Sequence, residues 1–273
     1  MLKAMHGIIA SGGDVATPWD LVNAAYNSVS FAHTVGGVYG VFFRPDGLRM
    51  YIITFATVYQ FTLSVAWDLS TATTTGMLSF SVAGQDSFPH DLFFKSDGTA
   101  MYVTGGQNNR VYQYVLGTAW DLSTATAVGL ITSPVYSQGS FPSGLFIKSD
   151  GTKLYKTSGG SVYQYSFGVA WDISTITYDS VTFNAADSPE AVFFKPDGLR
   201  IFTLAPSGAV TGVRQYDLGT AWDLSTASLT PTLAFDMSGQ EGDPRGMFFK
   251  PDGLRIYMGG TFTIPRNIYQ YDL

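Results

Sequence analysis

The chain has 273 residues, of which 45% are hydrophobic and 13% are charged, and this composition is ample for a buried core. Its net charge is -6, whereas nucleic-acid binding requires an excess of Lys and Arg to pair with phosphates, so nucleic acid is not an expected partner. Cysteine is absent, which excludes disulfides and thiolate metal sites, and no apolar run reaches the length of a membrane span, so membrane insertion is not expected.

The first 16 residues belong to none of the repeats that organise the rest of the chain. This segment carries Met1, Leu2, Met5, Ile8 and Ile9, and a glycine pair follows at 12–13. Its apolar patch is too brief for a secretory signal peptide. We therefore expect residues 1–16 to form an N-terminal arm that anchors the protein in a larger assembly through these five apolar side chains.

Two phrases recur through the remaining residues at nearly fixed spacing. The phrase W-D-L-S-T, or a close variant of it, uses all five tryptophans of the chain: Trp19, Trp67, Trp120, Trp171 and Trp222. The phrase F-F-K-P-D-G, with variants, ends at Gly47, Gly98, Gly151, Gly198 and Gly253, so its copies lie 47 to 55 residues apart. Five copies at this period indicate a repeat architecture.

In chain order, the first predicted elements are a turn at 18–21 and a strand at 26–32, which have no preceding partners. Each later unit then reads as strand, P-D-G turn, strand, variable loop, strand, W-D-L-S-T turn and strand. In the best-defined unit the four strands are expected at 92–95, 100–103, 111–116 and 128–135. The corresponding fourth strands of other units are expected at 77–82, 181–183 and 233–235.

Four strands in a unit of this length are typical of one blade of a β-propeller. The sequence therefore predicts an all-β, five-bladed propeller over residues 17–273. The last unit ends at Leu273 after its third strand. We expect the orphan strand at 24–32 to complete this blade by pairing with 267–273, which also removes an exposed sheet edge.

These repeats resemble the β-propeller repeats of the YVTN and WD-like "SPDG" class, in which P-D-G follows the innermost strand and an L-Y-V strand comes next. The W-D-L-S-T-A wording resembles repeats of uncharacterised phage and marine bacterial proteins. The resemblance covers residues 17–273 and implies a propeller. A shared fold does not by itself imply a shared function.

The turns between strands divide into two faces. The uniform face carries the P-D-G and W-D-L-S-T turns, which hardly change between copies. There Asp68, Asp121, Asp172 and Asp223 are expected to accept backbone N–H bonds from the Ser-Thr that follows, while each tryptophan covers its own blade. We interpret this face as structural, with a fivefold ligand site as the alternative.

The varied face carries the connections into each innermost strand and the loops between second and third strands. One aligned position holds a different residue in each copy: Tyr39, His90, Ser143, Glu190 and Arg245. Loop drift after duplication and a binding site both explain this variation. The candidate ligand-binding residues on this face are Tyr39, Phe55, His90, Asp91, Asn108, Arg110, Ser143, Glu190, Arg245 and Phe262.

The sequence also contains candidate residues for three catalytic or metal-binding roles. Glycoside hydrolysis needs two carboxylates about 5 to 10 Å apart. The candidates are Asp91, Glu190 and Asp243, but all three are expected beside proline on loops. The three histidines show no ligand spacing, so no metal or other cofactor is expected. Asp86, Asp187 and Asp243 precede the innermost strands, where they bind calcium or cap turns.

The sequence thus favours a non-enzymatic structural and binding protein. The expected role is a phage virion surface component (a fibre, spike or head decoration) assembled in the host cytoplasm. Its arm would contact other virion proteins, and its varied face would contact host-surface glycan or protein. The first alternative is a soluble lectin-type propeller, and the second is a glycoside hydrolase.

Overall fold

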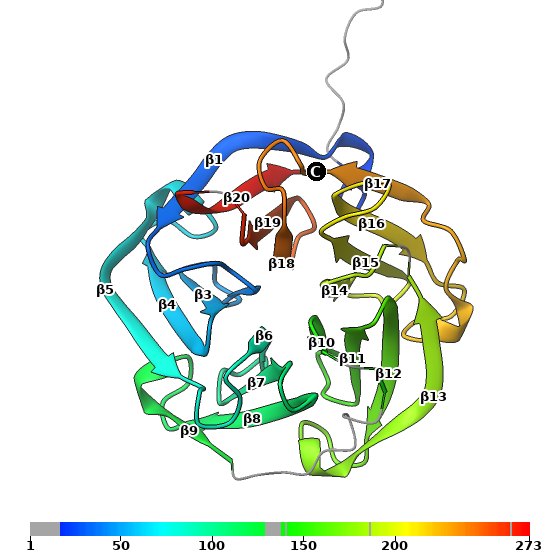
Figure 1. Ribbon diagram of the computed structural model, residues 1–273, viewed down its shortest axis with the longest axis horizontal. Helices are drawn as coiled ribbons and strands as arrows, with labels where there is room; N and C mark the ends of the chain where they lie inside the picture. The colour runs from blue at the N-terminus through cyan, green and yellow to red at the C-terminus, as the bar shows by residue number, and fades with distance from the viewer. Residues whose placement is uncertain (1–16, 129–137, 140, 186, 263) are drawn as a thin grey trace, which may run out of the picture.

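The computed structural model describes residues 17–128, 138–139, 141–185, 187–262 and 264–273. These residues form five four-stranded antiparallel sheets arranged around a central axis (Figure 1). The predicted five-bladed β-propeller is therefore confirmed. The described residues contain no helix with the length and hydropathy needed to cross a lipid bilayer.

Each blade contributes four strands, ordered from the axis to the rim. The first two blades contain β2 (Gly40–Phe43), β3 (Arg49–Thr54), β4 (Thr57–Leu63) and β5 (Ala72–Ser81), then β6 (Pro89–Phe94), β7 (Ala100–Gly105), β8 (Arg110–Leu116) and β9 (Ala125–Ala127). The next two contain β10 (Leu145–Ile147), β11 (Lys153–Ser158), β12 (Ser161–Phe167) and β13 (Ile176–Asn184), then β14 (Ala191–Phe194), β15 (Arg200–Ala205), β16 (Gly212–Asp217) and β17 (Leu233–Asp236). The strand expected at 128–135 falls almost wholly outside the described residues.

The fifth blade is assembled from both ends of the propeller. It contains β18 (Pro244–Phe249), β19 (Arg255–Gly260) and β20 (Arg266–Asp272), and β1 (Ala25–His33) supplies its outer strand (Figure 1). Strand β1 pairs antiparallel with β20 from Ala25 opposite Asp272 to His33 opposite Arg266. The predicted closure of the ring is confirmed.

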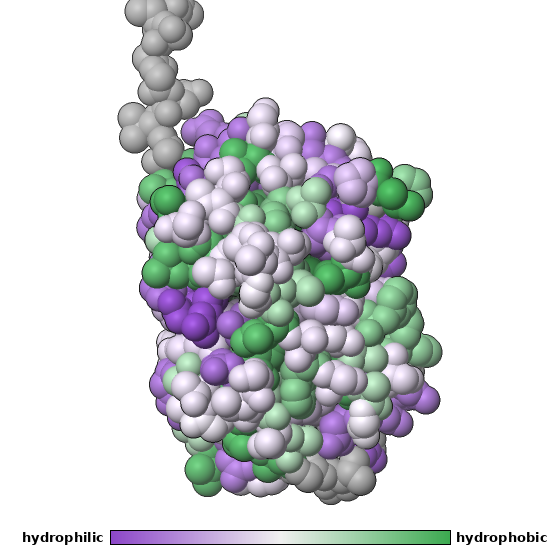
Figure 2. All heavy atoms as spheres, turned by 90° about the vertical axis from the view of Figure 1, so that its left-hand side faces the viewer, coloured by the Kyte–Doolittle hydropathy of each residue, from purple (hydrophilic) through white to green (hydrophobic). Residues whose placement is uncertain are grey.

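Burial follows the distance from the axis. All four residues of the innermost strand β2 are buried, whereas none of the ten residues of the outer strand β5 is. Continuous apolar runs such as G-V-F-F suit a strand covered on both faces, and the mixed A-T-T-T-G-M-L-S-F-S suits a strand at the rim. Figure 2 shows polar and apolar residues interspersed on that rim.

Five phenylalanines, one from each innermost strand, form a ring around the axis. Neighbouring rings meet edge to face, with centroids 5.1 to 5.5 Å apart. This geometry is favourable for aromatic pairs. We call this set the axial phenylalanines: Phe42, Phe93, Phe146, Phe193 and Phe248.

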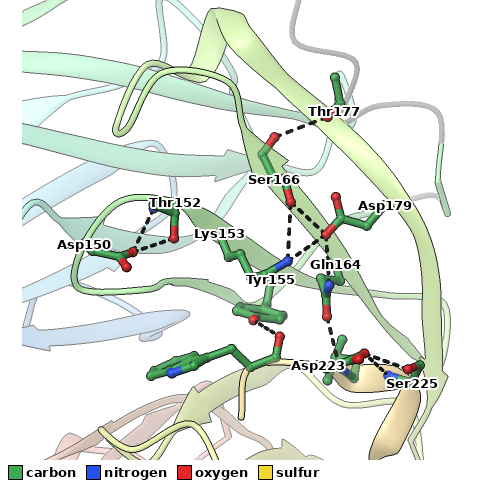
Figure 3. Close-up of polar contacts among 12 residues, drawn as sticks. Asp150, Thr152, Lys153, Tyr155, Gln164, Ser166, Thr177, Asp179, Asp223 and Ser225 are labelled. Atoms are coloured by element: carbon green, nitrogen blue, oxygen red, sulfur yellow. Dashed lines mark hydrogen bonds and ion pairs between the residues drawn. The ribbon is translucent and has the colours of Figure 1, made fainter. Parts of the chain in front are cut away.

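Neighbouring blades are joined by polar contacts that repeat around the disc. Between the third and fourth blades, Gln164 Oε1 accepts a hydrogen bond from the backbone N–H of Leu224 at 3.0 Å, and the Tyr155 hydroxyl donates to the Trp222 carbonyl at 2.6 Å (Figure 3). The glutamine contact occurs at all five junctions, at 3.0 to 3.3 Å. Its other pairs are Gln60 with Leu122, Gln113 with Ile173, Gln215 with Leu21 and Gln270 with Leu69.

Candidate functional site

The uniform face is built as expected. Each tryptophan donates its backbone N–H to the carbonyl of the P-D-G glycine in its own blade, at 2.8 to 3.1 Å. The indole lies so close that a Cβ on that glycine would come within 2.3 to 2.5 Å of it, which explains why only glycine occurs there. Asp68 Oδ1 accepts the N–H of Ser70 at 3.0 Å, and Asp121, Asp172 and Asp223 do the same. The predicted caps are confirmed.

On the varied face, four rings from two neighbouring blades come together. We call Tyr39, Phe55, Phe88 and His90 the aromatic cluster. Tyr39 lies 5.2 Å from Phe55 and 5.4 Å from His90 between ring centroids, and Phe88 lies 5.0 Å from His90. Phe55 is 58% exposed and Phe88 40% exposed. The cluster therefore presents apolar ring surface to solvent.

Beside this cluster lies a group of three charged side chains. Arg245 contacts Glu190 at 2.8 Å and Asp243 at 2.9 Å. We call these residues the ionic triad. Burial opposes the charge of Arg245, but Glu190 and Asp243 outweigh that effect and raise its pKa. The triad thus carries a fixed, paired guanidinium next to the rings.

The two parts are electrostatically linked. Burial, followed by the charge of Arg245, lowers the pKa of His90 to about 4, so this imidazole is neutral at physiological pH. Burial raises the pKa of Tyr39, and the charges of the ionic triad act on the same hydroxyl. The resulting surface combines neutral rings with a compact set of polar groups.

Asp91 lies in the wall of the propeller, so the expectation that it lies on an exposed loop is wrong. It is in strand β6 and is 7% exposed. Its Oδ1 accepts the N–H of Leu92 and its Oδ2 accepts the N–H of Leu145, both at 2.8 Å. Burial raises its pKa well above the usual range. Asp91 therefore joins β6 to β10 of the next blade.

Ser143 is likewise buried and engaged. Its Oγ lies 3.1 Å from Thr157 Oγ1, and its carbonyl accepts a hydrogen bond from Thr104 at 3.0 Å. In this blade the aligned position of the varied face is therefore a buried packing position. Of the five aligned residues, Tyr39 and His90 join the aromatic cluster, while Glu190 and Arg245 join the ionic triad.

The remaining candidates lie in loops of the varied face. Asn108 is exposed and donates its amide to the Gln85 carbonyl at 3.2 Å, and Arg110 begins β8. Phe262 is 72% exposed in the corresponding loop of the fifth blade. Their role in ligand binding stays a prediction. The five residues of the predicted arm lie outside the described residues.

Two carboxylates accept hydrogen bonds from the backbone of the varied-face loops. Asp86 accepts the backbone N–H groups of Phe88 at 2.9 Å and Asn108 at 3.0 Å, which is the expected capping role. Glu241 occupies the same position in the fifth blade and accepts the N–H of Phe262 at 2.9 Å. In the described ranges, no group of three or more His, Asp or Glu could hold a metal ion.

Sequence reasoning missed Phe88 and Glu241. The sequence pattern could have identified both. Glu241 stands three residues before Pro244, as Asp86 does before Pro89, and each proline opens an innermost strand. Phe88 immediately precedes Pro89. The sequence could not show that Phe88 contacts Tyr39 and Phe55, since this contact depends on how two blades meet.

Comparison with known proteins assigns this chain to no family. The sequence matches no protein-family model and no curated protein. Similar solved structures include a proposed 6-phosphogluconolactonase from Bacteroides uniformis, with 16% identity, 81% of this chain and 59% of that chain covered, and a TM-score of 0.46. Another is hydrazine synthase from Kuenenia stuttgartiensis, with 16% identity, 86% and 59% covered, and a TM-score of 0.46. The chain spans less than two thirds of either protein.

Proposed function

We propose that this chain is a non-enzymatic binding propeller whose varied face recognises carbohydrate. The observation that carries the proposal is the exposed aromatic cluster lying beside the ionic triad. Sugar rings present an apolar C–H face that packs on aromatic rings, and their hydroxyls pair with carboxylate and guanidinium groups. The varied face offers both kinds of group side by side.

Unused hydrogen-bonding capacity at the same place supports this proposal. His90 Nε2 and Arg245 Nε are buried and have no hydrogen-bond partner within the part of the chain that the structure describes. Buried polar atoms are normally paired, so each such exception calls for a reason. A ligand hydroxyl that approaches after a small side-chain shift would supply a partner for either atom.

The state of the candidate acids favours binding over glycoside hydrolysis. Hydrolysis requires one carboxyl group to donate a proton at the scissile bond and a second to act as base or nucleophile. Both oxygens of Asp91 accept backbone N–H groups inside the wall, and Glu190 and Asp243 are both paired with Arg245. None of these acids is poised for this chemistry.

The setting that we propose is the surface of a phage particle, where the varied face would contact host glycan. This part is supported by the resemblance of the repeats to phage and marine bacterial proteins and by the apolar composition of residues 1–16. Mass spectrometry and cryo-microscopy of purified particles from the source test it. A chain found freely in lysate and in no particle would leave the soluble lectin in its place.

Carbohydrate recognition is tested by a glycan array followed by titration of the strongest binder. Phe55→Ala and Phe88→Ala should each weaken binding about tenfold, because each removes a ring face. Val169→Ala is the matched control, since Val169 is 59% exposed on a uniform-face turn. Absence of saturable binding to any glycan, or equal loss in the control, would contradict the proposal.

A further inference from the structure

A pocket opens on the uniform face, at the axis of the disc. It has a volume of about 210 Å³, and the axial phenylalanines line it. Its remaining wall includes Trp19, Trp120, Trp171 and Trp222, while Ser96, Ser149 and three prolines of the P-D-G turns line it as well. We call it the axial pocket. Nothing in the proposed function uses it.

The walls of the axial pocket are held rigidly. All five tryptophans have a positive φ of 63 to 67°, a conformation that bulky residues rarely adopt. Each is fixed by its N–H bond to glycine, and the Trp222 carbonyl also accepts the Tyr155 hydroxyl of the neighbouring blade. A ligand entering such a preorganised pocket loses little free energy to ordering of the protein.

The lining selects for an apolar ligand. Phenylalanine and tryptophan rings dominate it, and the serines at 96 and 149 belong to exposed turns. A charged group placed among these rings would lose its hydration without gaining a partner. An aromatic ligand instead gains ring contacts on several sides.

The charges around the pocket cancel. In every blade the basic residue before the P-D-G turn pairs with the aspartate of that turn, as Lys148 does with Asp150 at 2.7 Å. The other pairs are Arg44 with Asp46, Lys95 with Asp97, Lys195 with Asp197 and Lys250 with Asp252. Lys148 Nζ also lies 5.5 Å over the Trp222 ring, so a cation already occupies one indole face. This arrangement disfavours a quaternary ammonium ligand.

The volume sets the size of the ligand. An apolar cavity of about 150 Å³ stays dry and takes up benzene. The larger axial pocket fits a fused two-ring system. We infer that the axial pocket is a binding site for an uncharged aromatic small molecule of the size of indole or naphthalene.

This site is separate from the varied face. Between the two lies a void of about 10 Å³, lined by the axial phenylalanines and by Asp91. On the varied-face side of this void, the innermost strands approach so closely that a Cβ on Gly246 would lie 2.8 Å from the Gly40 Cα. Ligands at the two faces therefore cannot exchange through the axis.

Isothermal titration of the full chain with indole tests the proposal. We expect saturable binding of one indole per chain and at least about tenfold weaker binding of choline. The double variant Ser96→Phe with Ser149→Phe places rings at the lip and should weaken indole binding at least about tenfold. Ser64→Phe, at an exposed position outside the pocket, is the matched control and should bind like the wild type.

Absence of saturable indole binding, unchanged binding in the double variant or tighter binding of choline would each overturn the inference. If the double variant does not fold, a crystal of the wild-type protein soaked with 5-bromoindole replaces it. Bromine density inside the axial pocket is the expected result. Density elsewhere on the molecule, or none, would overturn the inference equally.

Discussion

The side-chain oxygen of Gln215 accepts a hydrogen bond from the backbone N–H of Leu21 at 3.3 Å, across 194 residues of sequence. Leu21 begins the short turn that leads into β1, so this contact fastens the start of the propeller to the fourth blade. The pairing of β1 with β20 fastens it to the fifth. Ring closure therefore rests on two independent sets of contacts.

Replacing Gln215 with Met should destabilise the protein by about 1 to 3 kcal/mol, because it leaves a buried N–H without a partner. The midpoint and slope of urea unfolding measure this change. Gln107→Met is the matched control, since Gln107 is exposed, and it should change the free energy of unfolding by less than about 0.5 kcal/mol. Equal effects of the two variants would contradict the closing role of Gln215.

Asp91→Ala should destabilise the fold by about 1 to 3 kcal/mol, since it leaves the N–H groups of Leu92 and Leu145 unpaired. Glycan affinity, measured under conditions where the variant is folded, should stay within about twofold of the wild type. A variant of unchanged stability that no longer binds glycan would instead assign Asp91 to the ligand site.

Gly151→Ala should be among the most damaging single substitutions. Gly151 has a φ of 73°, and an added Cβ would lie 2.3 Å from the Trp171 ring. Gly76 has the same φ of 73° but open space around it, so Gly76→Ala isolates the backbone cost of about 1 to 2 kcal/mol. We expect Gly151→Ala to cost at least about 2 kcal/mol more by urea unfolding. Equal losses of stability in the two variants would show that the Trp171 ring moves to accommodate the added Cβ.

The two buried histidines, His33 and His90, should make the folded protein less stable as pH drops from about 6.5 to about 4. Burial lowers the pKa of both His33 and His90 to about 4, so the unfolded chain takes up protons below 6.5 while the folded protein does not. Each histidine contributes on the order of 3 kcal/mol over this window.

The double variant His33→Phe with His90→Phe isolates this effect. Urea unfolding at several pH values should show a weaker loss of stability toward low pH in the variant than in the wild type. Parallel pH profiles of the two proteins would contradict the assignment.

The propeller could be predicted because its determinants are local and repeated. Each P-D-G glycine and each capping aspartate acts within one turn, and the apolar runs of the innermost strands identify the axis. Closure followed from an orphan strand at one end and a missing strand at the other. These features need no knowledge of how blades meet.

The details of the varied-face site and of the axial pocket could not be predicted in the same way. Asp91 is buried because the neighbouring blade has glycine at position 40, where a Cβ would lie 2.3 Å from the Asp91 carboxylate. The aromatic cluster joins side chains from two blades, and the axial pocket joins side chains from all five. Such contacts depend on the radius and stagger of the ring, which the sequence pattern does not state.

The most direct test of the account is amide hydrogen exchange of the full chain with and without its strongest glycan. If the varied face binds carbohydrate, exchange should slow in segments around residues 38–41, 54–57, 86–91 and 243–246 and stay unchanged in the turns that end at the P-D-G glycines. Slowed exchange confined to those turns, or none anywhere at saturating glycan, would contradict the account.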